Sequence, residues 1–396
     1  MTVRNPLRAI GASRRLARIM AAALFVCALM VYNGTGFALG EETIDLPAGA
    51  LSSAKAAFVM EINTGRPLFS WNAGTKLPMA STTKIMTALL ALEMGNMDDM
   101  VTASRNAYGV PGTSIYLQLG ESLALRDMLL GLMLASGNDA AVAIAEHIGG
   151  SVDGFLALMN DRAARLGAYD TRFNSPNGLP AADHYTTAQD LAKITAAAMR
   201  LPAFREIVGT QRATIPWMDH DYDRVLTNKN RLLAEYQGAT GIKTGFTNAA
   251  GRCLVFGAKR GDMEIVGVVL NCSNWFDEAA RLMDICFGQY TMIRMLGDGD
   301  AVRPLAVRGG IGGSVPLKLQ GDLSAPLSKN ESVSVRLDLP DELRAPVAIG
   351  DTVGFARMYA NGALVAERPI IASAAVEERS YFGALRQIMK RWLLLA

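Results

Sequence analysis

The sequence of 396 residues has little net charge and few histidines. Lysine and arginine number 39 against 37 aspartates and glutamates, a net charge of +2. The chain therefore lacks the strong basic excess of nucleic-acid-binding proteins. Three histidines and the absence of a His-Glu-x-x-His motif exclude a histidine-rich metal site. The trio Asp219-His220-Asp221 predicts a solvated turn instead, since adjacent side chains in an extended segment point apart. We expect no metal, no cofactor and no nucleic-acid partner.

Cysteine is also scarce, with four residues in the chain. Cys27 lies inside an apolar run near the N-terminus, and the residues after it continue that run, unlike the context of a lipoprotein cysteine. Cys253, Cys272 and Cys286 remain, an odd number, so at least one thiol is free or pairs with another molecule. Buried apolar packing is the predicted role of each.

The apolar run at 19–32 is too short for an ordinary membrane span and typical of the core of a secretory signal. Gly36 and Ala38 are small residues at the positions expected before a cleavage site after Ala38. The run is preceded by the arginines Arg4, Arg8, Arg14, Arg15 and Arg18. We expect residues 1–38 to be a signal peptide that exports the chain to the periplasm, with an uncleaved anchor as the alternative.

The order of apolar patterns predicts an α/β (α+β) domain over residues 39–295. Strand-like runs at 56–62 and 68–71 flank a turn and predict a hairpin. A largely helical region follows from about Leu123 to Leu201, with breaks at 136–138 and 174–180. Three more strands and a helix come next, at 241–245, 252–258, 263–270 and 275–290. This order predicts a five-stranded antiparallel sheet flanked by helices.

Helical patterning stops near residue 296, and short alternating runs begin. Asn361-Gly362 between two apolar runs is a strong signal for a two-residue hairpin turn. Residues 296–374 are predicted to form a small all-β domain that acts as a spacer or docks a partner. Residues 375–396 predict an amphipathic helix whose apolar face carries Tyr381, Leu385, Ile388, Met389, Trp392 and Leu395. Such a helix suits a membrane surface, and docking on the protein itself is the alternative.

Ser81-Thr82-Thr83-Lys84 places a hydroxyl and an amine three residues apart at a predicted helix start after Pro78. Positions i and i+3 share a helix face, so the Ser81 hydroxyl and the Lys84 amine can meet. Apolar surroundings favour neutral lysine, which makes Lys84 a plausible base and Ser81 an activated nucleophile. Alone, the pattern is common and also fits a capping serine followed by a solvated lysine.

Two further motifs argue against the interpretation of Ser81 as a capping serine followed by a solvated lysine. Ser136-Gly137-Asn138 ends an apolar run, and Lys243-Thr244-Gly245 lies in a strand-like segment. The order S-x-x-K, S-x-N and K-T-G is typical of active-site serine enzymes that recognise penicillin. With their surroundings, the motifs resemble the D-alanyl-D-alanine carboxypeptidase family, the low-molecular-mass penicillin-binding proteins. The resemblance covers nearly the whole chain after the first fifty residues, with further matches at 174–179, 184–191 and 227–233.

The resemblance implies a β-lactamase/transpeptidase-like fold and a serine D-Ala-D-Ala carboxypeptidase. Its substrate would be the peptidoglycan stem peptide ending in D-Ala-D-Ala, and β-lactams would acylate Ser81. Lys84 would be the base, Ser136 a proton relay to the leaving D-alanine, and Asn138 would orient Lys84 and the substrate amide. The implied C-terminal helix would hold the enzyme on the outer face of the cytoplasmic membrane.

The third motif would bind the substrate. Lys243 would supply positive charge for the terminal carboxylate, Thr244 would hydrogen bond to it, and Gly245 would leave room for the substrate backbone. Backbone N–H groups at Ser81 and near Phe246 would form the oxyanion hole.

One departure from the family pattern affects specificity. Members often carry an arginine after the next strand, but residues 270–276 contain none. The acyl-enzyme chemistry is therefore better founded than strict exopeptidase specificity. Cleavage of cross-linked peptidoglycan by a D,D-endopeptidase stays an alternative, as does a catalytically weak wall-scaffold protein. A class A β-lactamase is disfavoured because the loop 174–179 lacks the glutamate needed for deacylation.

Overall fold

The structure is a computed structural model that describes residues 53–379. The predicted signal peptide at 1–38 and nearly all of the helix predicted for 375–396 lie outside the described residues. Within the described range, no single helix has both the length and the hydrophobicity needed to cross a bilayer, although two consecutive helices reach them jointly across an 83° bend.

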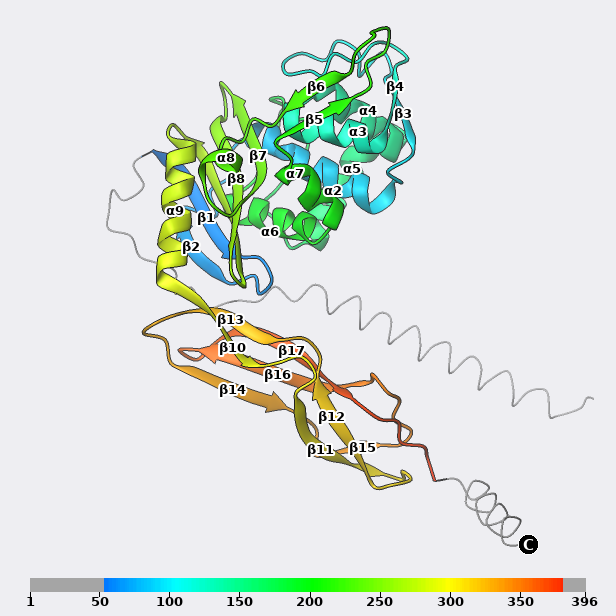
Figure 1. Ribbon diagram of the computed structural model, residues 1–396, viewed down its shortest axis with the longest axis vertical. Helices are drawn as coiled ribbons and strands as arrows, with labels where there is room; N and C mark the ends of the chain where they lie inside the picture. The colour runs from blue at the N-terminus through cyan, green and yellow to red at the C-terminus, as the bar shows by residue number, and fades with distance from the viewer. Residues whose placement is uncertain (1–52, 380–396) are drawn as a thin grey trace, which may run out of the picture.

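A five-stranded antiparallel sheet forms the centre of the first unit, as predicted (Figure 1). The outermost strand on one side is β2 (Pro67–Trp71) and on the other side β7 (Ala239–Thr247). Between them lie β1 (Ala54–Glu61), β9 (Met263–Cys272) and β8 (Gly251–Arg260), in that order. Nearly every residue of β9 is buried, because helices cover both faces of the sheet.

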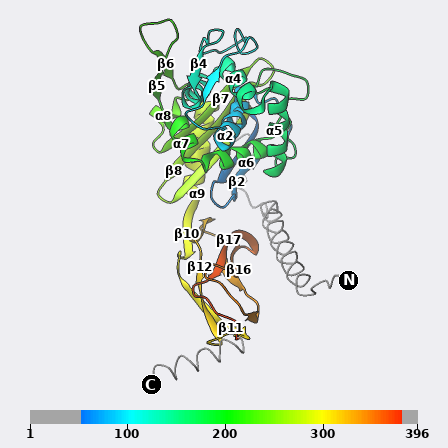
Figure 2. The same cartoon turned by 90° about the vertical axis from the view of Figure 1, so that its right-hand side faces the viewer.

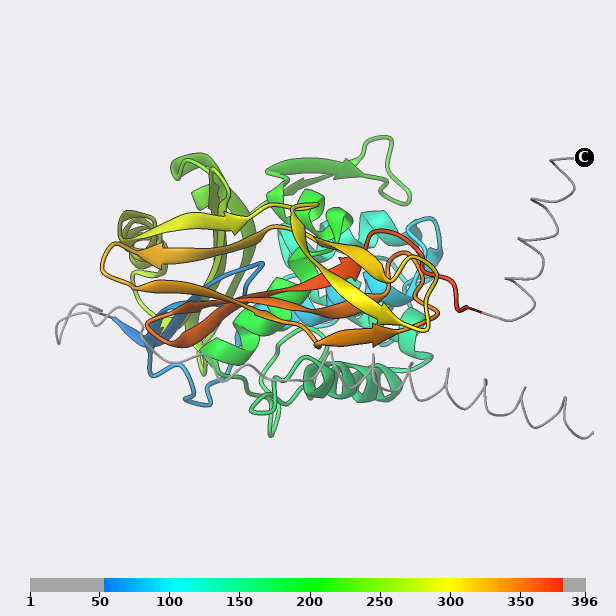
Figure 3. The same cartoon turned by 90° about the horizontal axis from the view of Figure 1, so that it is seen from below.

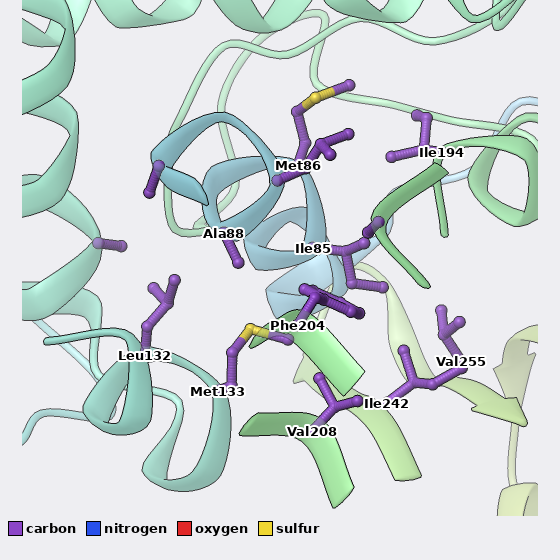
Figure 4. Close-up of a cluster of buried hydrophobic side chains, with 14 of the residues drawn as sticks. Ile85, Met86, Ala88, Leu132, Met133, Ile194, Phe204, Val208, Ile242 and Val255 are labelled. Atoms are coloured by element: carbon purple, nitrogen blue, oxygen red, sulfur yellow. The ribbon is translucent and has the colours of Figure 1, made fainter. Parts of the chain in front are cut away.

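The larger apolar core lies on one face of this sheet. Figure 4 shows its centre, where Ile85 of the first long helix lies beside Phe204, near Val208 and the sheet residues Ile242 and Val255. Met86 points away from them, on the other side of that helix. Each fully buried side chain of this size stabilises the fold by roughly 1.5–3 kcal/mol relative to leaving it in water. The helices that contribute are α2 (Lys84–Met94), α3 (Leu125–Leu130), α4 (Asn138–Gly149), α5 (Val152–Arg165), α6 (Ala188–Met199) and α7 (Pro202–Gly209).

A second, smaller core covers the opposite face. The main helix there is α9 (Trp275–Gln289), which agrees with the predicted closing helix, and α8 (Leu232–Glu235) adds a single turn. Figure 2 shows α9 leading directly out of the first unit into the strands below it.

The helical region predicted from Leu123 to Leu201 is more divided than expected. Leu123 belongs to β4 (Ser122–Ala124), which pairs with β3 (Met100–Thr102). Helix α3 continues as the π-helical turn η2 (Gly131–Ala135). Gly150 then adopts φ +70, and the Ser151 side chain accepts a hydrogen bond from the N–H of Gly154, so α4 ends and α5 begins. Residues 166–187 contain no helix, and a hairpin of β5 (Arg212–Ile215) and β6 (Arg224–Thr227) follows α7.

The second unit is all β, with its own apolar core. The Asn361-Gly362 turn adopts φ +47 and +83, the conformation that the hairpin signal predicted. The predicted boundary after residue 295 falls inside β10 (Tyr290–Leu296), which pairs with β13 (Leu323–Ser328). The remaining strands form one sheet in the order β14 (Val333–Asp338), β16 (Thr352–Ala360), β17 (Ala363–Ala372), β12 (Ser314–Leu319), β11 (Ala301–Arg308) and β15 (Glu342–Arg344).

The two units meet at the turn of the first hairpin. Figure 3 looks from below, with the strands of the second unit in front of the first unit. The Arg66 guanidinium donates to the carbonyl of Pro326 and forms an ion pair with Glu331. Both charged side chains are only 6% exposed. A buried pair of this kind has a defined geometry, because each charge needs the other to offset its lost hydration.

Candidate active site

Ser81 lies in the 3-10 turn η1 (Ala80–Thr83), immediately before α2, as the sequence predicted. The Thr82 hydroxyl donates to the carbonyl of Met79 at 2.6 Å, and the Thr83 hydroxyl donates to the carbonyl of Ala80 at 2.9 Å. These bonds hold the turn between Pro78 and the helix. Ser81 is thereby placed at the N-terminal end of α2, where helix dipoles favour negative charge.

Lys84 is fully buried, and its amine makes three hydrogen bonds. Nζ lies 3.1 Å from Ser81 Oγ, 2.7 Å from Asn138 Oδ1 and 2.6 Å from the carbonyl of Asn177. Burial lowers the pKa of Lys84 well below its ordinary value of 10.5, and the charges of Lys243 and Lys229 lower it further. The amine next to the serine is thus poised to accept a proton.

The second motif begins where η2 ends. Ser136 adopts a left-handed conformation with φ +67 and is buried, and Asn138 starts α4. Asn138 accepts from Lys84 through Oδ1, which agrees with the predicted orienting role. Its Nδ2 donates to the carbonyl of Pro111 at 2.7 Å, so contact with a substrate amide stays a prediction. Among the described residues, no hydrogen bond joins Ser136 to Lys84.

The Asn177 carbonyl is a site group that motif spacing did not reveal. Its neighbour Gly178 adopts φ +87, and a Cβ there would lie 1.9 Å from the carbonyl oxygen of Ala80. Glycine is therefore required for this loop to pass under η1 and present the Asn177 carbonyl to Lys84. The sequence signal for the Asn177 carbonyl was the segment 174–179, which matches the family pattern. The sequence alone indicated no physical role for this segment.

His184 begins the matched segment 184–191, but the motifs did not reveal its role. Its Nδ1 accepts from the N–H of Asn174 at 3.0 Å, and Nε2 lies 2.8 Å from the Thr83 hydroxyl. Burial lowers the pKa of His184 to about 4, so the ring is neutral near pH 7. With Nδ1 as an acceptor, Nε2 carries the proton and donates it to Thr83. The neutral ring thus connects the 174–184 loop to the turn that holds Ser81.

The third motif lies on β7, the edge strand of the sheet, next to η1. Lys243 is 1% exposed, and its amine donates to the carbonyl of Thr244 at 3.1 Å. Burial, together with the charge of Lys229, lowers the pKa of Lys243 to about 7. Lys229 itself is exposed at the loop that follows β6.

Position 245 requires glycine for a structural reason as well as for the predicted room for the substrate. A Cβ at this position would lie 2.9 Å from the backbone nitrogen of Ser81 and 3.1 Å from that of Thr82. A side chain would therefore push β7 away from η1. Phe246, the next residue, is 59% exposed, so its side chain leaves the core at the point where the motif ends.

Other chemistry-bearing residues lie apart from this arrangement. Cys253, Cys272 and Cys286 are buried thiols without disulfides, and burial raises the pKa of each. The trio at 219–221 occupies the exposed turn between β5 and β6, where the His220 ring stacks on Trp217. In residues 53–379, no group of three His, Cys, Asp or Glu side chains is placed to hold a metal ion.

Known proteins share both units of this chain. Residues 45–274 match the family described as D-alanyl-D-alanine carboxypeptidase, and residues 290–378 match the penicillin-binding protein 5, C-terminal domain. The chain is 31% identical to D-alanyl-D-alanine carboxypeptidase DacF of Bacillus subtilis over 390 residues, covering 95% of this chain and 98% of the relative. It is 31% identical to DacC of Escherichia coli over 384 residues, covering 90% and 91%.

Solved structures agree with the fold. Penicillin-binding protein 5 of Haemophilus influenzae superposes with a TM-score of 0.71 at 29% identity, over 85% of this chain and all of that one. A mutant of the Streptomyces K15 DD-transpeptidase superposes with a TM-score of 0.56 at 34% identity, over 59% of this chain and 98% of that one. The protein therefore belongs to the D-alanyl-D-alanine carboxypeptidase family.

Proposed function

We propose that this protein is a serine-type D-Ala-D-Ala carboxypeptidase that removes the terminal D-alanine from peptidoglycan stem pentapeptides. The observation that carries the proposal is the contact between Lys84 Nζ and Ser81 Oγ, 3.1 Å apart, with the lysine fully buried and its pKa lowered. A hydroxyl beside a neutral amine is an activated nucleophile for acyl transfer. Family membership directs that chemistry to the D-Ala-D-Ala bond.

Acylation would begin as Ser81 Oγ attacks the carbonyl carbon of the penultimate D-alanine and Lys84 takes the hydroxyl proton. The resulting oxyanion would accept hydrogen bonds from the backbone N–H groups of Ser81 and Phe246. When the C–N bond breaks, the leaving D-alanine nitrogen needs a proton, which Ser136 would pass on from Lys84. The products of this step are an ester on Ser81 and free D-alanine.

Deacylation would use the same groups. Lys84, neutral again after giving up its proton, would take a proton from water as the water oxygen attacks the ester. The bond to Ser81 then breaks, the serine oxygen recovers a proton, and the shortened peptide leaves. The hydrogen bonds of Lys84 to Asn138 Oδ1 and the Asn177 carbonyl support this double use, because they hold the amine in place through both steps.

Binding of the substrate carboxylate would fall to Lys243 and Thr244. A lysine with a pKa of about 7 is only partly charged in the free protein near neutrality. An arriving carboxylate would raise that pKa and draw the protonated form. The acylating β-lactams carry a comparable carboxylate and would use the same groups.

The test is to incubate the purified protein with a stem pentapeptide and with a cross-linked muropeptide, and to weigh the products. Loss of one D-alanine from the pentapeptide, absent with Ser81→Ala, is the expected result. Cleavage of the cross-link in preference to the pentapeptide would make the protein a D,D-endopeptidase instead. No cleavage of either substrate, with or without a penicillin adduct, would leave the scaffold alternative.

We also propose that the protein works in the periplasm, on the outer face of the cytoplasmic membrane. Support comes from the sequence alone, with a basic and apolar N-terminus that fits an export signal and a C-terminal segment with separated apolar and cationic faces. Peptidoglycan precursors at a membrane surface would then be within reach of the site, with the all-β unit between the two.

A further inference from the structure

The turn of the β5–β6 hairpin forms a shallow hollow of about 420 Å³ on the surface of the first unit. Its lining is largely aromatic, with two carboxylates beside the rings, and consists of Pro216, Trp217, His220, Asp221, Tyr222 and Asp223. Tyr222 is 63% exposed, and His220 and both aspartates are exposed as well. Small-molecule sites have this composition, a mainly apolar wall with a few polar groups. No residue of the three catalytic motifs lines the hollow, so it is a separate surface.

A buried ion pair holds the rings of the hollow in place. Arg224 Nη2 lies 2.9 Å from Glu121 Oε1, and the two side chains are 4% and 2% exposed. Arg224 Cζ lies 5.0 Å from the centre of the Trp217 ring. That ring stacks on His220 with centroids 4.2 Å apart, and Tyr222 meets the two rings edge-on at 5.8 and 5.2 Å. Because the rings are already ordered, a ligand would bind them at a small entropic cost.

A loop connects the hollow to the second catalytic motif. The N–H of Leu117 donates to the carboxylate of Asp139, the neighbour of Asn138, at 3.0 Å. The next residue, Gln118, donates through Nε2 to the carbonyl of Met218 in the hairpin turn at 3.2 Å. These contacts place the hairpin turn within roughly 15 Å of the Asp139 carboxylate. One large substrate could therefore occupy the hollow and the active site together.

The hairpin turn projects from the end of the first unit that is farther from the all-β unit (Figure 1, Figure 2). The described chain ends at Arg379, at the opposite end of the molecule. The proposed membrane segment follows Arg379 in the sequence. With that segment on the membrane, the hollow would face away from the bilayer, towards the polymeric wall.

The chemistry of the hollow fits an uncharged sugar chain. The C–H faces of a sugar ring stack on aromatic rings, and its hydroxyl groups donate hydrogen bonds to carboxylates. Nδ1 of His220 donates to the carbonyl of Met218 at 2.8 Å, so Nε2 of the neutral ring is a further acceptor. A cationic ligand is disfavoured because the Arg224 guanidinium already lies against the Trp217 ring. An anionic ligand is disfavoured because the two aspartates would repel it.

We propose that this hollow binds the glycan chain of peptidoglycan, the amino-sugar polymer to which the stem peptides are attached. The inference rests on the proposed carboxypeptidase function and deepens it, because it makes the polymer a better substrate than a free peptide. Tyr222 and His220 supply the stacking surface, and Asp221 and Asp223 accept hydrogen bonds from the sugar hydroxyls. The contact holds the enzyme on the wall while a stem peptide enters the active site.

Binding is tested with glycan chains from which the stem peptides have been removed. Isothermal titration calorimetry with the purified protein should show binding by wild type, and Tyr222→Ala should weaken it about 3- to 10-fold, the loss expected for one aromatic contact. Tyr222→Phe keeps the ring and should bind nearly as tightly as wild type. Tyr169→Ala is the matched control and should bind as wild type does, because Tyr169 is similarly exposed but belongs to the loop between α5 and α6.

Kinetics give a second readout, the ratio of kcat/KM for a glycan-linked pentapeptide to kcat/KM for the free pentapeptide. This ratio should fall about 3- to 10-fold in Tyr222→Ala, mainly through KM, and further when His220→Ala is added. Asp221→Asn keeps the shape of the hollow and should lower the ratio less, since it only weakens a charge-assisted hydrogen bond. Acylation by penicillin measures the amount of active protein in each preparation.

Two results would overturn the inference. One is the absence of glycan binding by the wild-type protein. The other is glycan binding, or a kinetic ratio, that stays within twofold of wild type when Tyr222→Ala and His220→Ala are combined. A wild-type protein that binds glycan chains through these residues but cleaves neither pentapeptide would instead remove the proposed function and retain the glycan site.

Discussion

The two units of this protein treat buried polarity in opposite ways. In the described residues, every polar or charged residue that is fully buried lies between Glu61 and Glu278, and none lies in the strands from β10 to β17. The all-β unit buries an apolar core, and its carboxylate Glu331 is buried where it pairs with Arg66 of the first unit. The first unit buries Lys84 and Lys243, although removing a charge from water is costly. The comparison indicates that the first unit tolerates the destabilising burial of two lysines because their amines belong to the active site.

The largest expected effect is the loss of the nucleophile. We expect Ser81→Ala to lower turnover by about 10⁶-fold, the effect of removing the nucleophile from a serine hydrolase. Mass spectrometry after penicillin treatment should show one adduct on the wild-type peptide that contains Ser81 and none on the variant. Ser136→Ala is the control and should still carry its adduct on Ser81. An adduct found on Ser136 would reverse the assigned roles.

Replacing Lys84 should cost less. Lys84→Arg keeps the charge but removes a group that can be neutral near pH 7, so acylation should slow by about 10²–10⁴-fold, as for a lost general base. Stopped-flow measurement with a chromogenic β-lactam gives the rate. Lys76→Arg, at an exposed lysine paired with Asp170, is the matched control. An acylation rate for Lys84→Arg within threefold of wild type would mean that another group takes the proton.

Breaking the contact between the units tests whether its buried charges behave like those of the site. Arg66→Ala leaves Glu331 buried without its partner, which should lower the free energy of unfolding by about 3–5 kcal/mol. Denaturant titration measures the change, and removing Glu331 as well should restore part of it. A decrease of less than about 0.5 kcal/mol in the free energy of unfolding of Arg66→Ala is typical of surface substitutions. Such a result would mean that the ion pair contributes no more than an exposed one.

Lys243 should show the stability cost of a buried charge directly. Its folded pKa of about 7 lies below the ordinary 10.5, so the unfolded chain binds the proton more tightly and the stability of the wild type rises with pH between these values. Lys243→Met should therefore raise the free energy of unfolding at pH 7 by about 1–4 kcal/mol, and the gain should shrink towards pH 10. Lys318→Met, at an exposed position of β12, should change nothing. A loss of stability in Lys243→Met at pH 7 would contradict this account.

The smallest expected effect on chemistry comes from removing residues 379–396. The truncated protein should react with penicillin at an unchanged rate, because no motif residue lies there. It should also fail to float with anionic liposomes, since an interfacial helix binds through apolar area and cations. Leu385→Glu combined with Trp392→Glu should give the same result. If the truncated protein still floats after signal cleavage is verified, another segment is the anchor, and if it unfolds, the helix docks on the protein.

Local patterns in the sequence were sufficient to predict much of the fold. The hairpin at the start, the strands after the K-T-G motif and the turn at Asn361-Gly362 all depend on residues close in sequence, whose periodicity and turn chemistry act locally. The order of the motifs likewise indicated the family. Division of the helical region was underestimated, because Gly150 and Ser151 are a weaker signal than an apolar run.

Tertiary structure alone decided how the site is assembled. The Asn177 carbonyl, 93 positions from Lys84, and His184, 101 positions from Thr83, reach the catalytic turn only because the chain folds back over it. Gly178 and Gly245 are required because distant backbone segments approach them closely, and no local sequence pattern indicates that approach. The pKa values of Lys84 and Lys243 follow from burial, and burial is a property of the packed molecule. The sequence determined which groups the protein possesses, and packing decided which of them meet and in what state of charge.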